Sequence, residues 1–147
     1  MTAPNESFEI LIVDDEPSLL DLLSRVSKKV FSEANITGCM SPQAALDHLS
    51  NGKKNLPNLI LLDIDLKQSV NGLMLIPVLL EQLQRKVPIV ILSSSNANQD
   101  IEQAYRSGAA AYTRKPDSLQ EWKSYVDMLK RYWYQLNRLP FRDFSNN

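Results

Sequence analysis

Five short apolar segments recur along this chain, and a stretch with helical spacing of its apolar residues follows each of them. Residues 8–13 and 59–62 are rich in β-forming side chains and stop abruptly at aspartate, which is typical of buried strands. The helical spacing is clearest over 17–30 and 73–83. Strands that alternate with helices and are apolar throughout belong to parallel sheets covered on both faces. The pattern therefore predicts a doubly wound α/β fold.

The complete pattern defines one domain of five βα units. The other expected strands and helices are 36–40, 42–49, 89–92, 98–107, 110–113 and 118–138. Pro77 is expected to start or kink the helix over 73–83, because proline has no backbone N–H to donate. The domain is expected to span 8–138, with a flexible N-terminal tail over 1–7 and a C-terminal tail over 139–147.

Composition narrows the classes of protein that this domain can belong to. The 147 residues are 44% hydrophobic and 22% charged with a net charge of -1, so no basic field attracts nucleic acid or an anionic membrane. A single cysteine, Cys39, and a single histidine, His48, exclude an intramolecular disulfide and a Cys- or His-rich metal centre. The start of the chain lacks signal-peptide features, and no apolar run approaches the ~18 residues of a membrane span, so we expect a cytoplasmic protein.

Each expected strand delivers a chemical group at its carboxyl end, where sheets of this class place their functional sites. These groups are Asp14 and Asp15 after the first strand, Asp63 after the third, Ser93 after the fourth and Lys115 after the fifth. If the first and third strands are neighbours, three carboxylates converge and require a proton or a cation. Oxygen ligands favour a hard ion, so Mg²⁺ is expected, with Mn²⁺ as the alternative. Such a site can hold a phosphoryl group on Asp63 while Lys115 neutralises charge and Ser93 donates a hydrogen bond.

Over about residues 8–130 the chain resembles the receiver domain of two-component response regulators. The resemblance rests on Asp14-Asp15, Leu61-Leu62-Asp63, Pro88-Ile-Val-Ile-Leu-Ser93 and Gly108-Ala-Ala-Ala-Tyr112-Thr-Arg-Lys115-Pro116. It implies a flavodoxin-like sheet of strand order 2-1-3-4-5. It also implies a signalling protein rather than an enzyme, one that takes a phosphoryl group from the phosphohistidine of a histidine kinase and assists its own phosphorylation and autodephosphorylation.

The same resemblance implies roles for individual residues. Asp63 accepts the phosphoryl group, Lys115 contacts it, and Asp14 and Asp15 hold Mg²⁺ together with Asp63 and the main-chain carbonyl of Asp65. Ser93 and Tyr112 form a switch pair, and Tyr112 is expected to turn inward on phosphorylation and signal to a downstream protein partner. The chain departs from the usual pattern at Lys67, Ser94 and Asp117.

Three other interpretations of the acidic residues stay open. Asp14 and Asp15 alone are also typical of a helix N-terminus, where acids interact favourably with the helix dipole. Asp63-Ile-Asp65 also resembles the DxD nucleophile motif of haloacid-dehalogenase-type phosphatases, with Asp65 as the general acid, although that family's acidic pair comes late in the chain. The last is a receiver-like scaffold that is never phosphorylated.

The expected helix over 118–138 carries an extended apolar face. Its residues, at alternating spacings of three and four, are Leu119, Trp122, Val126, Leu129, Trp133 and Leu136. At about 30 Å this helix is longer than a strand of about 17 Å, so its last turns are expected to overhang the sheet. The face predicts a homodimer through Trp122, Leu129, Trp133 and Leu136. In the alternative, Trp133 and Leu136 fold back onto their own domain.

The end of the chain carries a second, shorter resemblance. Tyr132-Trp133 and Leu139-Pro140 are similar to the C-terminal segment of single-domain regulators that serve bacterial phytochromes.

Overall fold

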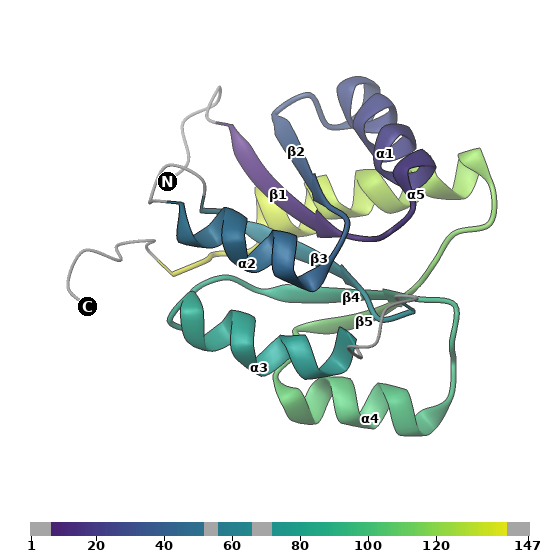
Figure 1. Ribbon diagram of the computed structural model, residues 1–147. Helices are drawn as coiled ribbons and strands as arrows, with labels where there is room; N and C mark the ends of the chain where they lie inside the picture. The colour runs from purple at the N-terminus through teal and green to yellow at the C-terminus, as the bar shows by residue number, and fades with distance from the viewer. Residues whose placement is uncertain (1–6, 52–55, 66–71, 141–147) are drawn as a thin grey trace.

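The computed structural model describes residues 7–51, 56–65 and 72–140. Five parallel strands form one sheet in the order β2-β1-β3-β4-β5 (Figure 1). The strands are β1 (Phe8–Val13), β2 (Ala34–Cys39), β3 (Leu59–Asp63), β4 (Ile89–Ser93) and β5 (Ala111–Arg114). The doubly wound α/β fold and its strand order are thereby confirmed.

The helices cover both faces of the sheet. One face carries α1 (Pro17–Val30) and α5 (Leu119–Leu129), and the other carries α2 (Pro42–Ser50), α3 (Gly72–Gln82) and α4 (Asn98–Ser107) (Figure 1). Side chains alternate between the two faces along a strand, so Ile10 and Ile12 of β1 join the core under α1 and α5, while Leu11 and Val13 join the other core. The inner strands β1, β3 and β4 are buried on both faces, which explains why their sequences are apolar almost throughout, without alternation.

The helix ends follow from local chemistry. Ser41 and Ser118 each accept a backbone N–H of the first helical turn, from Ala44 at 3.0 Å and from Glu121 at 3.1 Å. Gly108 ends α4 in the left-handed conformation, with a φ of 112° that favours glycine.

Two details of the elements differ from the sequence predictions. β2 begins at Ala34 instead of residue 36, because it pairs along the whole of β1 from Phe8↔Ala34 onward. Pro77 does not start α3 but lies inside it, and the alternative that it kinks the helix stays a prediction. The hydrogen bond that Pro77 cannot donate would reach the carbonyl of Leu73 near the start of the helix, and the buried side chains of Ile76 and Leu79 hold α3 against the sheet.

The C-terminal helix differs more. It is α-helical only to Leu129 and continues as a π-helix, η2 (Lys130–Leu136). Trp133 is buried in the core under α1 and α5, and the neighbouring Tyr134 packs its ring against Phe8 and Phe31, with ring centroids 5.6 and 5.4 Å away. Two consecutive aromatic residues thus reach the same core where the helix winds as a π-helix.

This packing corrects the predicted interface. Trp122, Leu129 and Trp133 are only 6%, 2% and 7% exposed, so these three side chains stabilise their own domain and offer no surface to a partner. Leu136, at 73%, is the exposed member of the predicted set. Of the two residues in the fold-back alternative, Trp133 packs on its own domain and Leu136 does not; Leu139 packs against the same core as Trp133.

The predicted tails fall mostly outside the described residues, since 1–6 and 141–147 are not described. Cys39 is buried in β2, and His48 is half-buried on α2. Among the helices of the described ranges, none combines the length and the apolar character needed to cross a membrane.

Candidate functional site

The carboxyl ends of the strands bring the predicted polar residues together. Asp63 and Ser93 are the last residues of β3 and β4, and Asp14 and Lys115 directly follow β1 and β5. Adjacent parallel strands end at one edge of the sheet, so residues far apart in the sequence become neighbours. The convergence that the sequence predicts for these groups is present.

Lys115 lies between two buried carboxylates. Its Nζ donates to Asp63 Oδ2 at 2.9 Å and lies 3.6 Å from Asp14 Oδ2. Asp14 and Asp63 are 0% and 2% exposed, so neither charge is screened by bulk water. The other oxygen of Asp63, Oδ1, accepts the backbone N–H of Asp65 at 2.8 Å. One ammonium group therefore compensates two carboxylates, which leaves the site with excess negative charge.

Burial and the neighbouring charges shift the pKa values of Asp14 and Lys115. Burial raises the pKa of Asp14 to about 6 and outweighs the backbone hydrogen bond from Glu16, which lowers it; the negative charge of Asp63 raises this pKa further. Burial lowers the pKa of Lys115, but the hydrogen bond to Asp63 and the charges of Asp14, Asp63 and Asp65 outweigh it, so the pKa lies above its usual value. Lys115 stays protonated, while Asp14 resists ionisation in the absence of a further positive charge.

The acidic edge of this site fits a divalent cation. Asp14 Oδ1 accepts the N–H of Glu16 at 2.9 Å, whereas the buried Oδ2 has no hydrogen-bond partner among the described residues. One carboxylate oxygen from each of Asp14, Asp15 and Glu16 lies within 4.8 Å of the others. An all-oxygen cluster of this kind suits a hard ion. Glu16 was not among the predicted ligands, although its place beside the pair in the sequence is a signal that could have indicated it.

The side chain of Asp65 reaches toward β4. Its Oδ1 accepts the hydroxyl of Ser93 at 3.2 Å, and its Oδ2 accepts the backbone N–H of Ser94 at 2.8 Å. Ser93 Oγ also accepts the N–H of Ser95 at 2.9 Å. The resemblance to receiver domains implies a metal contact through the main chain of Asp65, and the phosphatase alternative makes its side chain a general acid. Neither predicted the hydrogen bonds to Ser93 and Ser94, because alternation along β3 does not fix the direction of a side chain beyond the end of the strand.

Tyr112 is already turned toward the loop after β4. Its hydroxyl donates to the carbonyl oxygen of Ser95 at 2.9 Å, and its N–H donates to the hydroxyl of Tyr105 on α4 at 3.2 Å. The predicted switch pair is therefore joined through one loop, since Ser95 contacts both Ser93 and Tyr112. Tyr105, which the sequence analysis did not single out, links this pair to α4.

Gly72, at the start of α3, packs against the backbone beyond Asp63. A Cβ at this position would lie 2.8 Å from Ile64 Cα and 2.9 Å from the Asp63 carbonyl oxygen. The close approach positions the end of β3. Lys67, where the sequence departs from the usual pattern, lies in 66–71, outside the described residues.

Residues 10–127 match the family described as the response regulator receiver domain. The chain belongs to this family. It is 30% identical over 138 residues to the probable methanogenesis regulatory protein FilR2 of Methanothrix harundinacea, a match that covers 92% of this chain and 89% of that protein. The receiver family of two-component phosphorelays thus accounts for nearly the whole of the described chain.

Solved structures support the same fold. The Mn²⁺-bound form of the response regulator Rcp1 matches this receiver with a TM-score of 0.77 at 23% identity, over 90% of this chain and 99% of that one. The phosphorylated cyanobacterial phytochrome response regulator RcpA matches with a TM-score of 0.80 at 21% identity, over 91% and 99%. Both likenesses concern the fold. The family match favours the receiver over the haloacid-dehalogenase-type alternative.

Proposed function

We propose that this receiver accepts a phosphoryl group on Asp63 from the phosphohistidine of a sensor histidine kinase. The observation that carries the proposal is the ion pair between Lys115 Nζ and Asp63 Oδ2, 2.9 Å apart, at a strand end beside the acidic cluster. In the proposed step an oxygen of Asp63 attacks phosphorus and the P–N bond breaks. The electron pair of that bond stays on the histidine nitrogen, and the ring, which carries a proton on its other nitrogen, leaves as neutral imidazole.

The residues around Asp63 have distinct parts in this step. Lys115 stabilises negative charge on the transferring oxygens, and the backbone N–H of Asp65 orients the acceptor carboxylate. Asp14 and Asp15 with Asp63, Glu16 nearby and the main-chain carbonyl of Asp65 are the proposed ligands for Mg²⁺. When bound, this ion supplies positive charge for the phosphoryl oxygens.

Signalling is proposed to pass through Ser93 and Tyr112. A phosphoryl group on Asp63 recruits the Ser93 hydroxyl, and the loop that Ser93 shares with Tyr112 then shifts. The shift repacks α4, β5 and α5 and changes their fit to a downstream protein. We further propose that the site supports hydrolysis of its own aspartyl phosphate, so that the signal decays without another enzyme.

The test of Asp63 is phosphorylation by acetyl phosphate with Mg²⁺, followed by intact mass measurement. Wild type is expected to gain one phosphoryl group per chain, and Asp63→Asn to gain none because the amide is not a nucleophile. Asp47→Asn, an exposed aspartate on α2, is the matched control and is expected to behave as wild type. Stoichiometric labelling of a folded Asp63→Asn protein would refute the assignment. Turnover of small phosphate esters would indicate the phosphatase, and no mass gain would indicate the scaffold.

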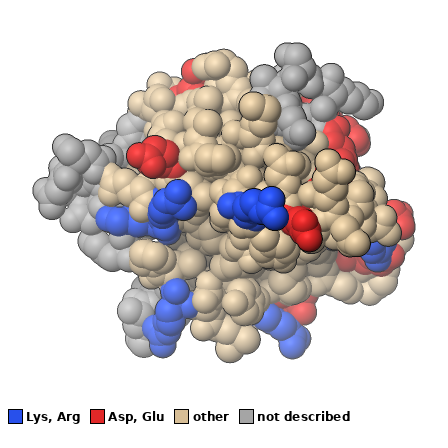
Figure 2. Space-filling model, turned by 90° about the horizontal axis from the view of Figure 1, so that it is seen from below, with Lys and Arg blue, Asp and Glu red and all other residues tan. Residues whose placement is uncertain are grey.

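We propose proteins, rather than nucleic acid or membrane, as the partners of this receiver. On the face shown in Figure 2, below α3 and α4 in Figure 1, lysine and arginine side chains lie in separate groups among uncharged and acidic residues. This scattered arrangement, with the net charge of -1, supports protein partners.

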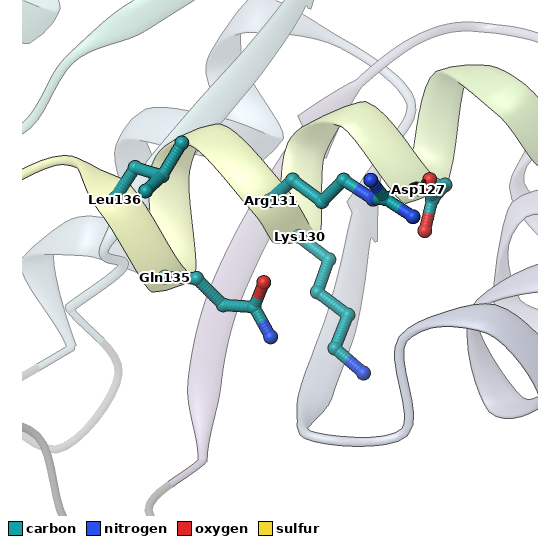
Figure 3. Close-up of a pocket in the computed structure, with 5 residues that line it drawn as sticks. All are labelled: Asp127, Lys130, Arg131, Gln135 and Leu136. Atoms are coloured by element: carbon teal, nitrogen blue, oxygen red, sulfur yellow. Dashed lines mark ion pairs between the residues drawn. The ribbon is translucent and has the colours of Figure 1, made fainter.

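One proposed partner is a second copy of the chain, bound through the outer face of α5 and η2. A shallow pocket of about 390 Å³ lies there, lined by Asp127, Lys130, Arg131, Gln135 and Leu136 (Figure 3). The exposed ion pair of Arg131 with Asp127, 2.9 Å long, can exchange partners across a two-fold axis. Leu136, 73% exposed at the edge of the pocket, offers apolar area that such a contact would bury.

A further inference from the structure

The carboxylate of Asp65 holds two hydrogen-bond donors beside Asp63. It accepts the Ser93 hydroxyl at 3.2 Å and the Ser94 backbone N–H at 2.8 Å, and both donors belong to the end of β4 and the loop that follows. Ser93 Oγ in turn accepts the N–H of Ser95 at 2.9 Å, so its hydroxyl direction is fixed. Both donors therefore give their hydrogen bonds to one negatively charged side chain, that of Asp65.

Each of these two groups can donate only one hydrogen bond. A serine hydroxyl donates one hydrogen bond, and so does a backbone amide. Asp63 lies two residues before Asp65, and its own Oδ1 and Oδ2 are bound by the Asp65 N–H and by Lys115. A phosphoryl group on Asp63 that accepts the hydrogen bond of the Ser93 hydroxyl therefore replaces Asp65 as the acceptor, because one O–H group cannot make a full hydrogen bond to two anions at once.

We infer that the Asp65 side chain is an internal competitor of the phosphoryl group: phosphorylation of Asp63 must displace the Asp65 carboxylate from Ser93 and Ser94. This inference rests on the proposed role of Asp63. It makes Asp65 a positioning residue that acts through Ser93, in addition to any contact made by its main chain.

The structure allows the exchange without rearranging the sheet. Asp65 is exposed, so its carboxylate can turn into water, while its backbone N–H remains with Asp63. Phosphorylation replaces the single negative charge of the Asp63 carboxylate by up to two negative charges on the phosphoryl group, which favours the departure of the Asp65 carboxylate. The released loop includes Ser95, whose carbonyl accepts the Tyr112 hydroxyl, so the displacement reaches the proposed switch directly.

The test measures how tightly the receiver binds beryllofluoride, an analogue of the phosphoryl group, in the presence of Mg²⁺. The affinity is followed by ¹⁹F NMR for wild type, Asp65→Ala, Asp65→Asn and Asp117→Ala. Asp65→Ala is expected to bind about tenfold more tightly, because no acceptor competes for Ser93 and Ser94. Asp65→Asn removes the same charge but keeps a weaker acceptor, so its gain is expected to be about threefold. Asp117→Ala removes an exposed carboxylate that pairs with Arg114 and is expected to match wild type.

Two further measurements separate competition from a general effect of charge. In a Ser93→Ala background the gain from Asp65→Ala is expected to shrink, because one of the contested donors is gone. Amide exchange at Ser94 is expected to be faster in unliganded Asp65→Ala than in wild type. Equal gains for Asp65→Ala and Asp65→Asn would show a charge effect alone and overturn the inference, as would weaker binding by Asp65→Ala.

Failure of the proposed function gives a different result. In that case wild type gains no phosphoryl mass from acetyl phosphate and binds no beryllofluoride, and the inference falls with it. If every variant is phosphorylated on Asp63 but Asp65→Ala binds beryllofluoride as wild type does, only the competition is wrong.

Discussion

At the scale of single residues, the site contains one more buried carboxylate than it has positive charges: Asp14 and Asp63 share the single ammonium group of Lys115. Asp14 is fully buried, its Oδ2 has no hydrogen-bond partner among the described residues, and its pKa is raised to about 6, chiefly by burial. In the unfolded chain the pKa of this carboxyl lies near its ordinary value of 3.8. Between these values the folded protein retains a proton that the unfolded chain has lost, so stability falls as pH rises and the loss is complete above about pH 6.

We therefore expect Asp14→Asn to stabilise the metal-free receiver at pH 7. The gain is about 1–2 kcal/mol, because the amide removes a buried charge, and it disappears below about pH 4, where Asp14 is protonated in both states. Urea unfolding in the presence of a chelator measures it, with the exposed Asp47→Asn as control. Added Mg²⁺ is expected to stabilise wild type more than the variant, since the variant lacks a ligand. A variant less stable than wild type at pH 7 with chelator would contradict this account of the site.

A second residue-scale prediction concerns the buried hydroxyl that joins β5 to α5. Thr113 Oγ1 donates to the carbonyl of Ile91 and accepts the Tyr125 hydroxyl at 2.8 Å, and burial raises the pKa of Tyr125 to about 12. The contribution of the buried Tyr125 hydroxyl to folding stability is complete below pH 10 and is lost as pH rises through about 12. Between these two pH values the phenol ionises readily only in the unfolded chain. Tyr125→Phe is expected to lower the free energy of unfolding by about 1 kcal/mol at neutral pH. Between pH 10 and 12 the free energy of unfolding of this variant is expected to fall less steeply than that of wild type. Tyr132→Phe, an exposed tyrosine, is the control, and equal slopes for wild type and Tyr125→Phe would rule out the buried bond.

At the scale of elements, the close contact between α3 and the end of β3 aligns the acceptor. A methyl group on Gly72 would meet backbone atoms of Ile64 and Asp63 at 2.8 and 2.9 Å, and backbone cannot yield as a side chain can. Gly72→Ala is expected to lower the free energy of unfolding by about 1–3 kcal/mol and to slow phosphorylation by acetyl phosphate. Gly38→Ala is the matched control, because its methyl group meets the flexible end of Leu20 in a different part of the sheet. If Gly72→Ala is phosphorylated at the wild-type rate, the contact does not align Asp63.

The elements themselves were largely predictable from the sequence, for a physical reason. Strands such as Leu59–Asp63 are buried on both faces, so nearly every side chain is apolar, and a polar residue marks the strand end. The same marks indicated Asp14, Asp63, Ser93 and Lys115. The π-helix was not predictable, because Lys130–Leu136 retains a spacing of apolar residues that also suits an α-helix.

At the scale of the whole molecule, tertiary packing decides what an apolar helix face means. The spacing of Trp122, Leu129 and Trp133 is the same for a core and for an interface, and the sequence alone did not distinguish them. The structure assigns these side chains to the core, next to Leu23 and Phe31 of the first βαβ unit. Similarly, the Asp65 carboxylate binds Ser93 across β3 and β4, a contact between residues 28 positions apart that local pattern does not encode.

The homodimer is therefore predicted through the side chains that the core leaves exposed. Tyr132 and Leu136 are 48% and 73% exposed on η2, and the ion pair of Asp127 with Arg131 lies along the same helix. A symmetric contact buries the apolar pair of each copy and lets each arginine meet the aspartate of the other. Leu136→Glu is expected to convert a dimer into a folded monomer, because it places charge in the contact without disturbing the core. Light scattering at tens of micromolar, with and without phosphorylation of Asp63, measures the mass.

Met74→Glu is the matched control for this substitution, since Met74 is 66% exposed on α3, on the opposite face of the sheet. It is expected to keep the wild-type mass. Trp133→Glu does not serve the same purpose, because Trp133 is buried and its substitution would unfold the domain before it tested an interface. A wild-type protein that stays monomeric in both phosphorylation states would defeat the proposed dimer. A dimer that survives Leu136→Glu but not Met74→Glu would move the interface to α3.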